Sequence, residues 1–389
     1  MAKLGDICFQ ITDGSHNPPA GIENSKHLML SSKNINDDEI TTTAPRFLTD
    51  EQFDIENKRT NVLSGDLLMT IVGTVGRVAV VPEMLAGICL QRSVAVIKPN
   101  PTIINNRYLM YQLQSMRKFL ESEARGVAQK GIYLKQVGDL SVITPPLDEQ
   151  YRVVDTLDHI SGLIHIYQRQ LTKLDELIKA RFVEVFGDML LNSLEWPEKS
   201  LESLADIVSG ITKGRKTTET ELIEVPYMAV SNVKSGYIDW TTVKTILATK
   251  QEIEQYRLMP DDILMTEGGD PDKVGRGAII KNPLKDSIHQ NHIFRVRLDK
   301  SELLPAYFAE YLQHQKAKRY FLGCAKQTTG IASINMRQLR ALPVLIPPLP
   351  LQNQFAAFVA EVDKSKADVQ KALDQTQLLF DSLMQQYFG

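Results

Sequence analysis

The sequence has few cysteines, no long apolar run and no metal-binding spacing, and each absence excludes a class of protein. Its three cysteines, Cys8, Cys89 and Cys324, are too few and too scattered for a disulfide framework or a zinc site, which fits a reducing cytoplasm. No run approaches the ~18 apolar residues of a membrane span, and the stretch MAKLGDICFQ at the N-terminus has no long apolar core. The histidines show no HExxH or comparable metal spacing. We therefore expect a soluble cytoplasmic protein without a metal site.

An excess of positive charge is also missing. The chain has 44 Lys and Arg against 47 Asp and Glu, a formal net charge of -3. This balance gives no strong electrostatic footprint for nucleic acid. Any affinity for DNA would need local basic patches or basic partner proteins.

What the sequence does contain is a long helical segment that occurs twice, at residues 145–187 and 347–389. The copies align without a gap, because Pro145-Pro146 answers Pro347-Pro348 and Phe186-Gly187 answers Phe388-Gly389. Paired prolines block helix upstream, and the residues after them suit a first helical turn. Each segment is expected to form one helix of roughly 55 to 60 Å.

Apolar residues in both segments recur at alternating steps of three and four, which is the spacing of a coiled-coil seam. In the first helix this seam is Leu157, Ile160, Ile164, Tyr167, Leu171, Leu174, Ile178, Phe182 and Val185. In the second helix it is Val359, Val362, Val369, Leu373, Phe380, Met384 and Tyr387, with polar residues at Lys366 and Thr376. Two equal helices, each closing half of the chain, favour pairing with each other over separate burial of each apolar face.

The duplication extends beyond the helices. The matching stretches are Leu4 to Ile7 with Leu204 to Ile207, Thr12-Asp13-Gly14 with Thr212-Lys213-Gly214, Asn34-Ile35 with Asn232-Val233, and Val75-Gly76-Arg77 with Val274-Gly275-Arg276. The predicted order is domain, helix, domain, helix, with segments 1–144, 145–187, 188–346 and 347–389.

Each domain is expected to have an α+β fold with a β-rich core. Alternating or β-branched runs at 66–81, broken at Gly73 and Gly76, and at 93–99 predict strands. Residues 105–123 and 304–322 predict helices.

Two local motifs suggest catalysis, and neither is complete. Asn17-Pro18-Pro19 resembles the Asn-Pro-Pro-aromatic loop of amino-methyltransferases, but Ala20 replaces the aromatic residue and no glycine-rich turn for a methyl donor lies nearby. An acidic stretch of the second domain resembles a nuclease metal cluster. This stretch comprises Asp261, Asp262, Glu267, Asp270 and Asp272 with Lys273. The corresponding stretch of the first domain lacks these carboxylates. A surface loop is the simpler interpretation of both, so we predict no catalytic residue.

Taken together, several motifs resemble the DNA-specificity subunit of type I restriction-modification systems. The second half of the first helix ends in the sequence ARFVEVFGD (Ala180 to Asp188), followed by Asn192 and Trp196-Pro197, and the helix opens on Pro-Pro-Leu-x-x-Gln. The stretch from Ile11 to His16, with Pro18, Pro19 and then Ser31 to Ile35, is similar to a recurrent opening of that family's target recognition domains. The resemblance covers the whole chain in order.

The resemblance implies a non-catalytic reader of double-stranded DNA. Two target recognition domains would each contact one half of a bipartite site, with the two helices packed antiparallel as a ruler between them. The helices would also dock two methylation subunits, which carry S-adenosylmethionine and methylate adenine. Two restriction subunits would add ATP- and Mg²⁺-dependent translocation and cleavage. The chain itself would need no cofactor and would not contact a membrane.

Side chains that read bases must be hydrogen-bond donors and acceptors on glycine-punctuated loops. In the first domain we predict DNA contacts from Ser15, His16, Asn17, Lys33, Asn34, Arg77, Gln91, Arg92 and Lys130. In the second domain we predict them from Lys213, Arg215, Lys216, Asn232, Lys234, Lys273, Arg276, Asn291, His292, Lys326 and Gln327. Asn34 and Asn232 suit a turn role equally well, because asparagine readily bonds nearby backbone.

Three other functions are compatible with parts of the sequence. One is the specificity subunit of a related, type II-like system that cuts on both sides of its site. Another is a coiled-coil scaffold with no DNA role. A self-contained nuclease or methyltransferase is the third, and the incomplete motifs weigh against it.

Overall fold

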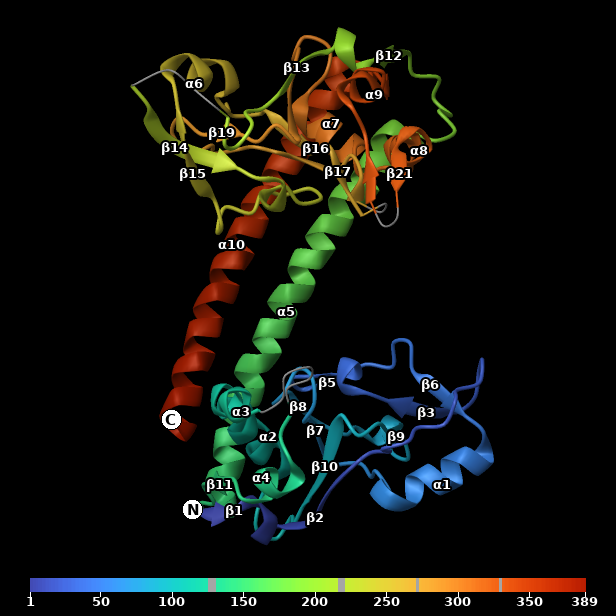
Figure 1. The fold of residues 1–389 in the computed structure, drawn as a ribbon, viewed down its shortest axis with the longest axis vertical. Helices are drawn as coiled ribbons and strands as arrows, with labels where there is room; N and C mark the ends of the chain where they lie inside the picture. Colours follow the sequence, from blue (N-terminus) through green and yellow to red (C-terminus); the bar gives the residue numbers. More distant parts are fainter. Residues whose placement is uncertain (125–130, 216–220, 271–272, 329–330) are drawn as a thin grey trace. The chain divides into compact units, whose positions relative to one another are not determined.

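The computed structural model describes residues 1–124, 131–215, 221–270, 273–328 and 331–389. The chain divides into two compact units, which we call unit 1 (Met1–Gln168 with Lys371–Gly389) and unit 2 (Arg169–Gln370). Helices α5 (Leu147–Phe186) and α10 (Leu349–Phe388), of 40 residues each, run through both units, so each unit contains part of both helices (Figure 1).

Unit 1 is built on an antiparallel four-stranded sheet in the order β2-β10-β7-β8. Its strands are β2 (Cys8–Asp13), β10 (Val94–Pro99), β7 (Leu67–Thr70) and β8 (Val78–Val80). A smaller sheet contains one antiparallel and one parallel pair; its strands are β6 (Arg46–Leu48), β3 (His27–Leu30) and β9 (Cys89–Leu90). Two short pairs are β1 (Ala2–Lys3) with β11 (Ser141–Val142), and β4 (Ile35–Asn36) with β5 (Glu39–Ile40).

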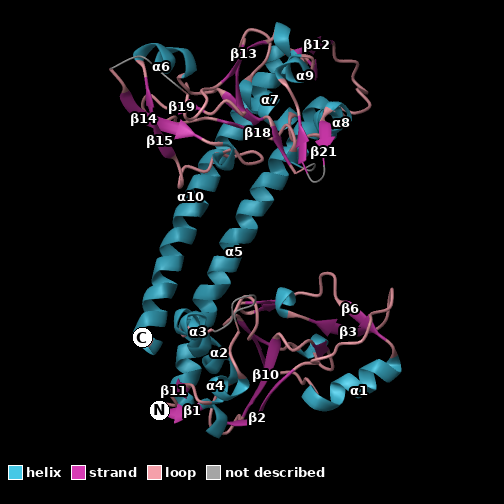
Figure 2. Ribbon diagram, viewed as in Figure 1, coloured by secondary structure: helices cyan, strands magenta, loops and turns pink. Residues whose placement is uncertain are grey.

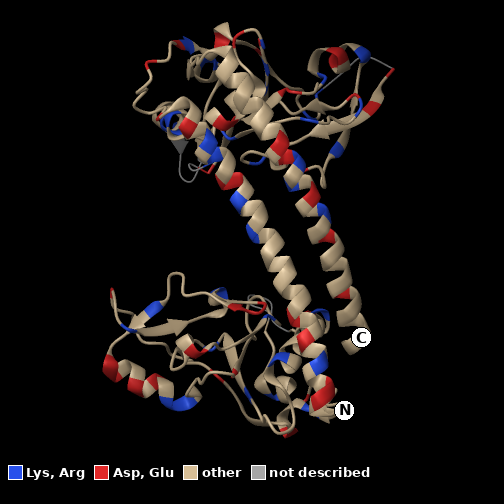
Figure 3. Cartoon of the chain, turned by 180° about the vertical axis from the view of Figure 1, so that it is seen from behind, with Lys and Arg blue, Asp and Glu red and all other residues tan. Residues whose placement is uncertain are grey.

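The two faces of the unit 1 sheet bury different cores, because successive side chains of a strand point to opposite sides. Leu67 and Met69 of β7 share a core with helices α2 (Asn106–Ser115) and α5, whereas Leu68 packs with Leu30 of the smaller sheet. Further helices are α1 (Asp50–Thr60), α3 (Arg117–Glu123) and α4 (Leu134–Gly138). In α1 the first turn is acidic and the last turn is basic, which suits the helix dipole (Figure 3).

Unit 2 repeats this design with the same strand order. In both units strands are combined with short helices (Figure 2). Its four-stranded sheet is β13 (Ala205–Ser209), β20 (Ile293–Leu298), β16 (Ile263–Thr266) and β18 (Gly277–Ile279); its smaller sheet is β15 (Lys244–Ala248), β14 (Ile223–Met228) and β19 (Ile288–His289). The helices are α6 (Lys250–Tyr256), α7 (Pro305–Tyr311), α8 (Gln315–Cys324) and α9 (Met336–Arg340), and β12 (Glu198–Ser200) pairs with β23 (Pro343–Leu345). A sheet of β17 (Gly268–Gly269), β22 (Ile331–Ser333) and β21 (Lys326–Thr328) is added. The predicted tandem α+β duplication is confirmed.

The structure shifts the alignment of the two halves at their first strands. The amides of Leu4 and Leu201 each donate to the carbonyl of the residue before the last short strand, β11 or β23 (2.8 and 3.0 Å). Leu4 therefore corresponds to Leu201, and the expected match to Leu204 was wrong. The motifs misled because short apolar stretches repeat by chance, whereas backbone hydrogen bonds fix the register. Farther along the strand, Gly14 corresponds to Gly210, because a Cβ on Gly14 would meet Leu90 O as a Cβ on Gly210 would meet His289 O. The offset between the halves falls by one residue here, since the β2–β10 register shifts at Lys98/Pro99.

The helices expected at 105–123 and 304–322 are each interrupted. Helix α2 gives way to α3 at Met116, whose backbone (φ -81°, ψ 0°) turns the chain, and α7 gives way to α8 between Tyr311 and Gln315. The apolar spacing runs on across both interruptions, so the sequence pattern does not reveal them.

Both long helices form within the segments 145–187 and 347–389, and every expected seam residue is buried or half-buried. In unit 1, Phe380 and Met384 near the end of α10 join the core that contains Leu157 near the start of α5. In unit 2, Phe182 near the end of α5 lies edge-on to Phe355 near the start of α10, with ring centroids 5.4 Å apart. The start of each helix thus lies beside the end of the other, which confirms antiparallel pairing.

One polar seam residue has a partner across the seam, since Lys366 Nζ lies 2.5 Å from Asp175 Oδ1. Within the described ranges, no helix has both the length and the apolar content that crossing a membrane requires.

Candidate nucleic-acid interface

In unit 1, loops that carry many of the predicted DNA-contacting residues meet at one end of the sheet. We call this set the first loop cluster: residues 14–17, 31–34, 71–77 and 91–93. Ser15 N donates to Leu90 O (2.7 Å), and Arg92 N donates back to Ser15 O (2.9 Å). Ser32 N donates to Ser93 Oγ (3.1 Å), which ties the loop after β3 to the loop after β9. The structure thereby brings together Ser15, His16, Asn17, Lys33, Gln91 and Arg92.

The second loop cluster of unit 2 has the same construction, in residues 210–215, 229–234, 267–270, 273–276 and 290–292. Ile211 N donates to His289 O (2.9 Å), and Asn291 N donates back to Ile211 O (3.0 Å). Glu267 N donates to His292 O (3.0 Å), which adds the loop after β16. Lys213, Lys273, Asn291 and His292 lie on these connected loops.

Each loop cluster depends on a glycine where two backbones approach closely. A Cβ on Gly14 would lie 2.1 Å from Leu90 O, and a Cβ on Gly210 would lie 2.0 Å from His289 O. No side chain fits at such distances, so a glycine is required at both positions.

Exposed cations in both clusters are available to phosphates. Lys33, Arg92 and Lys213 are exposed and form no ion pair within the part of the chain that the structure describes. In the view of Figure 3, basic and acidic residues are interspersed in both units. Electrostatic attraction would therefore come from a few local groups, in agreement with the weak overall charge.

Other predicted side chains are oriented by carboxylates. His16 Nε2 lies 2.8 Å from Asp13 Oδ2, and His292 Nδ1 lies 2.5 Å from Glu267 Oε2. Lys273 pairs with Asp270, and this pairing lowers the pKa of the Asp270 carboxyl. These groups stay on the surface but have restricted positions.

Some predicted residues have structural partners away from the cluster tips. Arg215 Nε donates to Glu252 Oε1 of α6 (2.5 Å), and this contact lowers the pKa of the Glu252 carboxyl. Arg77 Nη1 donates to Asn36 Oδ1 of β4 (3.2 Å). Arg276 directly precedes β18, as Arg77 directly precedes β8. Lys234 lies two residues after the 3-10 turn 230–232. Lys326 lies in β21, in the added sheet.

The two predicted asparagines are buried in turns. Asn34 Oδ1 accepts from Ser31 N (3.1 Å), and its Nδ2 donates to Thr43 O (3.0 Å). Asn232 Oδ1 accepts from Ala229 N (2.9 Å), and its Nδ2 donates to Asp239 O (3.0 Å). Both amides are satisfied inside their own loops, which is the turn role considered as the alternative.

Of the predicted DNA-contacting residues, Lys130 and Lys216 lie outside the described residues, and so does the side chain of Gln327.

Sequence reasoning missed two residues of the clusters. Ser93 accepts the hydrogen bond that joins two loops of unit 1, and Gln290 Oε1 accepts from Val230 N (3.4 Å) in unit 2. A signal was present for Gln290, because Gln91 and Gln290 occupy the same place in the two halves: each forms a parallel bridge, with Ser15 and with Ile211.

The acidic stretch of unit 2 is distributed over separate ion pairs. Asp262 pairs with Arg297 (2.7 Å) and Asp261 with Lys300 (2.6 Å), while Asp272 lies outside the described residues. Among the residues with described positions, no group of three or more His, Cys, Asp or Glu is arranged to hold a metal ion.

The proline-rich loop of unit 1 is likewise engaged in structure. Arg46 Nη1 donates to Pro19 O (2.7 Å) and to Pro18 O (3.3 Å), so this loop is held against β6.

Comparison with known families gives a match over most of the chain. A family model described as "Type I restriction modification DNA specificity domain" matches residues 23–176 and again residues 193–376. The two matches correspond to the two halves of the duplication.

Curated relatives match at low identity. The type I restriction enzyme EcoKI specificity subunit of Escherichia coli (strain K12) is 21% identical over 310 residues, covering 75% of this chain and 67% of that protein. The putative type I restriction enzyme MjaX specificity subunit of Methanocaldococcus jannaschii is 26% identical over 196 residues, covering 50% of this chain and 45% of that protein. The aligned part thus spans about half the length of the MjaX relative.

Two solved structures share the fold. The S subunit of a type I restriction-modification system from M. genitalium superposes with a TM-score of 0.56 at 14% identity, over 98% of this chain and 94% of that chain. A chain from a study of complex assembly and conformational transition of the type I R-M system superposes with a TM-score of 0.53 at 16% identity, over 100% and 96% of the two chains.

Proposed function

Because this chain belongs to the type I restriction modification DNA specificity family, we propose that it is the specificity subunit of such a complex and reads a bipartite DNA site, one half with each loop cluster. The main observation in support is that the same backbone arrangement occurs in both loop clusters with different side chains. Ser15 and Ile211 make the same backbone contacts. The residues that follow differ, with His16 and Asn17 in unit 1 against Thr212 and Lys213 in unit 2.

This difference in side chains supports two different half-sites. Base edges in the major groove are distinguished by the donors and acceptors that face them. The two loop clusters share one backbone conformation but carry different hydrogen-bonding side chains. Each cluster would therefore hold its side chains in equivalent positions and select different bases. Arg92 in unit 1 and Asn291 in unit 2 illustrate the change, since arginine suits guanine and asparagine suits adenine.

The chemistry of methylation would reside in partner subunits. The proposed partners are two methylation subunits that bind S-adenosylmethionine, and in a restriction-competent complex two restriction subunits that use ATP and Mg²⁺. Their basic surfaces would supply the phosphate neutralisation that a net charge of -3 does not provide.

Exposed apolar residues on the long helices support docking of these partners. Leu163 and Ile166 of α5 are 44% and 49% exposed, and Leu378 of α10 is 70% exposed. Leu163 and Ile166 lie three positions apart and so share one face of α5, and neighbouring exposed apolar side chains suit a surface that a partner covers.

The long helices would also set the gap between the half-sites. Each helix of 40 residues is unbroken, and at ~1.5 Å per residue spans about 60 Å. A pair of such helices that runs through both units is stiff enough to act as the ruler of the complex.

The test is selection from random duplex DNA by the purified chain together with its methylation subunit. The proposal predicts two specified half-sites separated by a fixed, unspecified gap. Absence of any selected sequence would favour the scaffold alternative. Methylation or cleavage by the chain alone, with labelled S-adenosylmethionine or Mg²⁺, would favour a self-contained enzyme. A type II-like system would show the same split site, with cuts on both sides of it when all subunits are present.

A further inference from the structure

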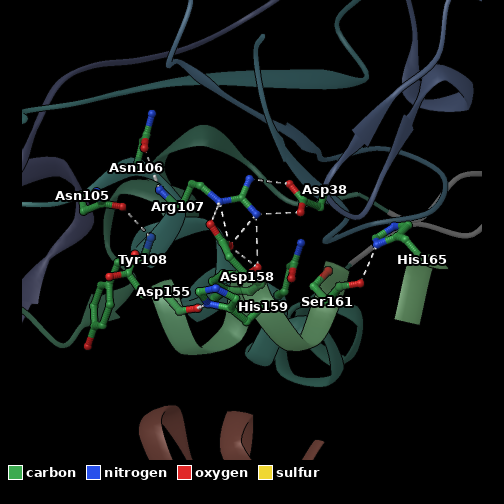
Figure 4. Close-up of polar contacts among 12 residues, drawn as sticks. Asp38, Asn105, Asn106, Arg107, Tyr108, Asp155, Asp158, His159, Ser161 and His165 are labelled. Atoms are coloured by element: carbon green, nitrogen blue, oxygen red, sulfur yellow. Dashed lines mark hydrogen bonds and ion pairs between the residues drawn. The ribbon is translucent and has the colours of Figure 1, made fainter. Parts of the chain in front are cut away.

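In unit 1, Arg107 at the start of α2 joins a helix and a turn that are distant in sequence (Figure 4). Its Nε donates to both carboxylate oxygens of Asp158 on α5 (2.8 and 2.7 Å). Its Nη1 and Nη2 donate to the two oxygens of Asp38 (2.9 and 2.8 Å). Tyr111 OH donates to Asp158 Oδ1 (2.6 Å), which holds that carboxylate in place.

The turn that Arg107 holds also positions a predicted DNA-contacting residue. Asp38 lies at the tip of the β4–β5 turn, where its amide donates to Val78 O (3.0 Å). On the same turn, Asn36 Oδ1 accepts from Arg77 Nη1 (3.2 Å). Strands β4 and β5 have two residues each, and so short a hairpin is not stable by itself. Its position, and that of the Arg77 guanidinium, therefore depends on contacts to its two tip residues: Arg107 pairs with Asp38, and Arg117 pairs with Asp37.

Unit 2 has the same turn without this connection. Gly236 N donates to Gly277 O (3.0 Å) as Asp38 N donates to Val78 O, so Gly236 corresponds to Asp38. Both positions have a left-handed backbone, with φ of 84° and 56°. The residues that correspond to Arg107 and Asp158 are Ala306 and Ala360. Arg276 of unit 2 stands where unit 1 has Arg77. The two units therefore share this arginine and differ in the ion pairs of Arg107 that hold the turn.

We propose that Arg107 is a positioning residue for DNA recognition by unit 1, acting through Asp38 and Asn36 to fix Arg77 relative to α5, and that unit 2 recognises its half-site without such a support. The proposal rests on the function proposed above. A guanidinium that is already oriented loses less conformational freedom on binding, so its support adds to discrimination between bases.

The test uses the full chain expressed with its methylation subunit and plasmids that carry single-base variants of each half-site. Arg77→Ala first identifies the half-site that unit 1 reads. Arg107→Ala, which installs the residue that unit 2 has, is expected to reduce discrimination at that same half-site roughly tenfold and to leave the other half-site unchanged. Arg107→Lys is expected to restore only part of it, since a lysine cannot make the forked contacts.

Lys98→Met provides the matched control. It removes the ion pair between Lys98 and Asp66 in unit 1, which does not contact the turn. This control is expected to lower the stability of unit 1 while discrimination at both half-sites stays as in the unmodified chain. The amide of Asp38 should exchange with solvent faster in Arg107→Ala and not in Lys98→Met.

Two results overturn the inference while leaving the proposed function intact: unchanged discrimination in Arg107→Ala, or an equal loss in Lys98→Met, which would mean that stability alone matters. Absence of split-site methylation by the unmodified chain with its partner would instead overturn the proposed function, and this inference with it.

Discussion

Gln150 and Gln352 make the same three hydrogen bonds in the two units. Gln150 Oε1 accepts from Asn105 N (2.7 Å), and its Nε2 donates to Ile103 O (3.0 Å) and Pro145 O (2.7 Å). Gln352 makes the corresponding contacts with Leu304 N (2.8 Å), Glu302 O (3.0 Å) and Pro347 O (2.7 Å). Both side chains are fully buried. The Pro-Pro-Leu-x-x-Gln motif is therefore a device that locks the start of each long helix to the domain before it.

Replacing this glutamine should destabilise the unit that contains it. Gln150→Leu leaves a buried amide and two carbonyls without partners, so we expect a loss on the order of 3 kcal/mol in the free energy of unfolding. Gln352→Leu should have a similar effect on unit 2. Denaturant unfolding followed by amide hydrogen exchange in each unit measures both. The control is Gln377→Leu on the exposed face of α10, for which a change below about 0.5 kcal/mol is expected; equal effects of all three variants would contradict the locking role.

The close approach at Gly14 predicts a half-site effect. Gly14→Ala places a methyl group against Leu90 O and should displace the first loop cluster, abolishing recognition of one half-site. Gly210→Ala should do the same at the other half-site. Gly138→Ala serves as the control, because a Cβ there meets no atom within 4 Å. Selection from DNA libraries reads out all three, and simultaneous loss of both half-sites in Gly14→Ala would argue against separate recognition by the two units.

Phosphate contacts should appear as salt dependence. Lys33→Ala removes an exposed cation that forms no ion pair in the described part of unit 1. For each contact to a phosphate, the slope of log affinity against log salt concentration should fall by about 1. Lys3→Ala removes an exposed cation that pairs with Asp139 instead and should leave the slope unchanged. A slope that no variant alters would show that these loops do not approach the DNA backbone.

A buried histidine makes unit 2 sensitive to acid. Burial lowers the pKa of His289 to about 4, and the nearby Arg295 guanidinium acts in the same direction. Because the unfolded chain binds the proton near pH 6.5 and the folded chain does not, stability is full above that pH and falls as the pH drops from about 6.5 to about 4, by about 3 kcal/mol.

The matched variant is His289→Leu, since leucine stands at the corresponding position of unit 1, Leu90. We expect its free energy of unfolding to vary less between pH 6.5 and pH 4 than that of the unmodified chain, as measured by denaturant titrations across that range. The same pH dependence in both proteins would mean that His289 does not contribute it.

Shortening both long helices should change the gap between the half-sites and leave the half-sites unchanged. Deleting one heptad from each helix keeps the seam in register and shortens the pair by about 10 Å, which corresponds to roughly three base pairs. Library selection with the deletion variant should return the original half-sites with a shorter gap. Deleting a heptad from one helix only breaks the pairing and is expected to abolish selection. New half-sites with the original gap would contradict the ruler role.

Much of the architecture follows from the sequence because it is local or repeated. The seam from Leu157 to Val185 shows in the spacing alone, and the strands on either side of Gly73 and Gly76 are bounded by turns at those glycines. Features set by contacts between distant residues were not visible. The register of Leu4 depends on a hydrogen bond to Leu140, and the break at Met116 interrupts no apolar pattern.

The candidate site shows the same division. Loops carrying Ser15, Lys33 and Arg92 could be selected because donors follow strands and glycines. Whether a side chain on such a loop is exposed depends on tertiary contacts: Asn34 turns inward to bond its own loop, and Arg215 is taken up by Glu252. The role of Arg107 rests on residues more than fifty positions away in sequence, Asp38 and Asp158, which the fold alone brings together.

The central claim, that this chain reads a split DNA site for a methylating complex, is tested most directly by single-molecule methylome sequencing of cells with and without its gene. The gene for the methylation subunit is expressed in both. The account predicts a bipartite adenine-methylated motif that is present with the gene and vanishes on deletion, giving both half-sites and their gap at once. An unchanged methylome, with the methyltransferase demonstrably present, would contradict it and favour a scaffold without a role in DNA recognition.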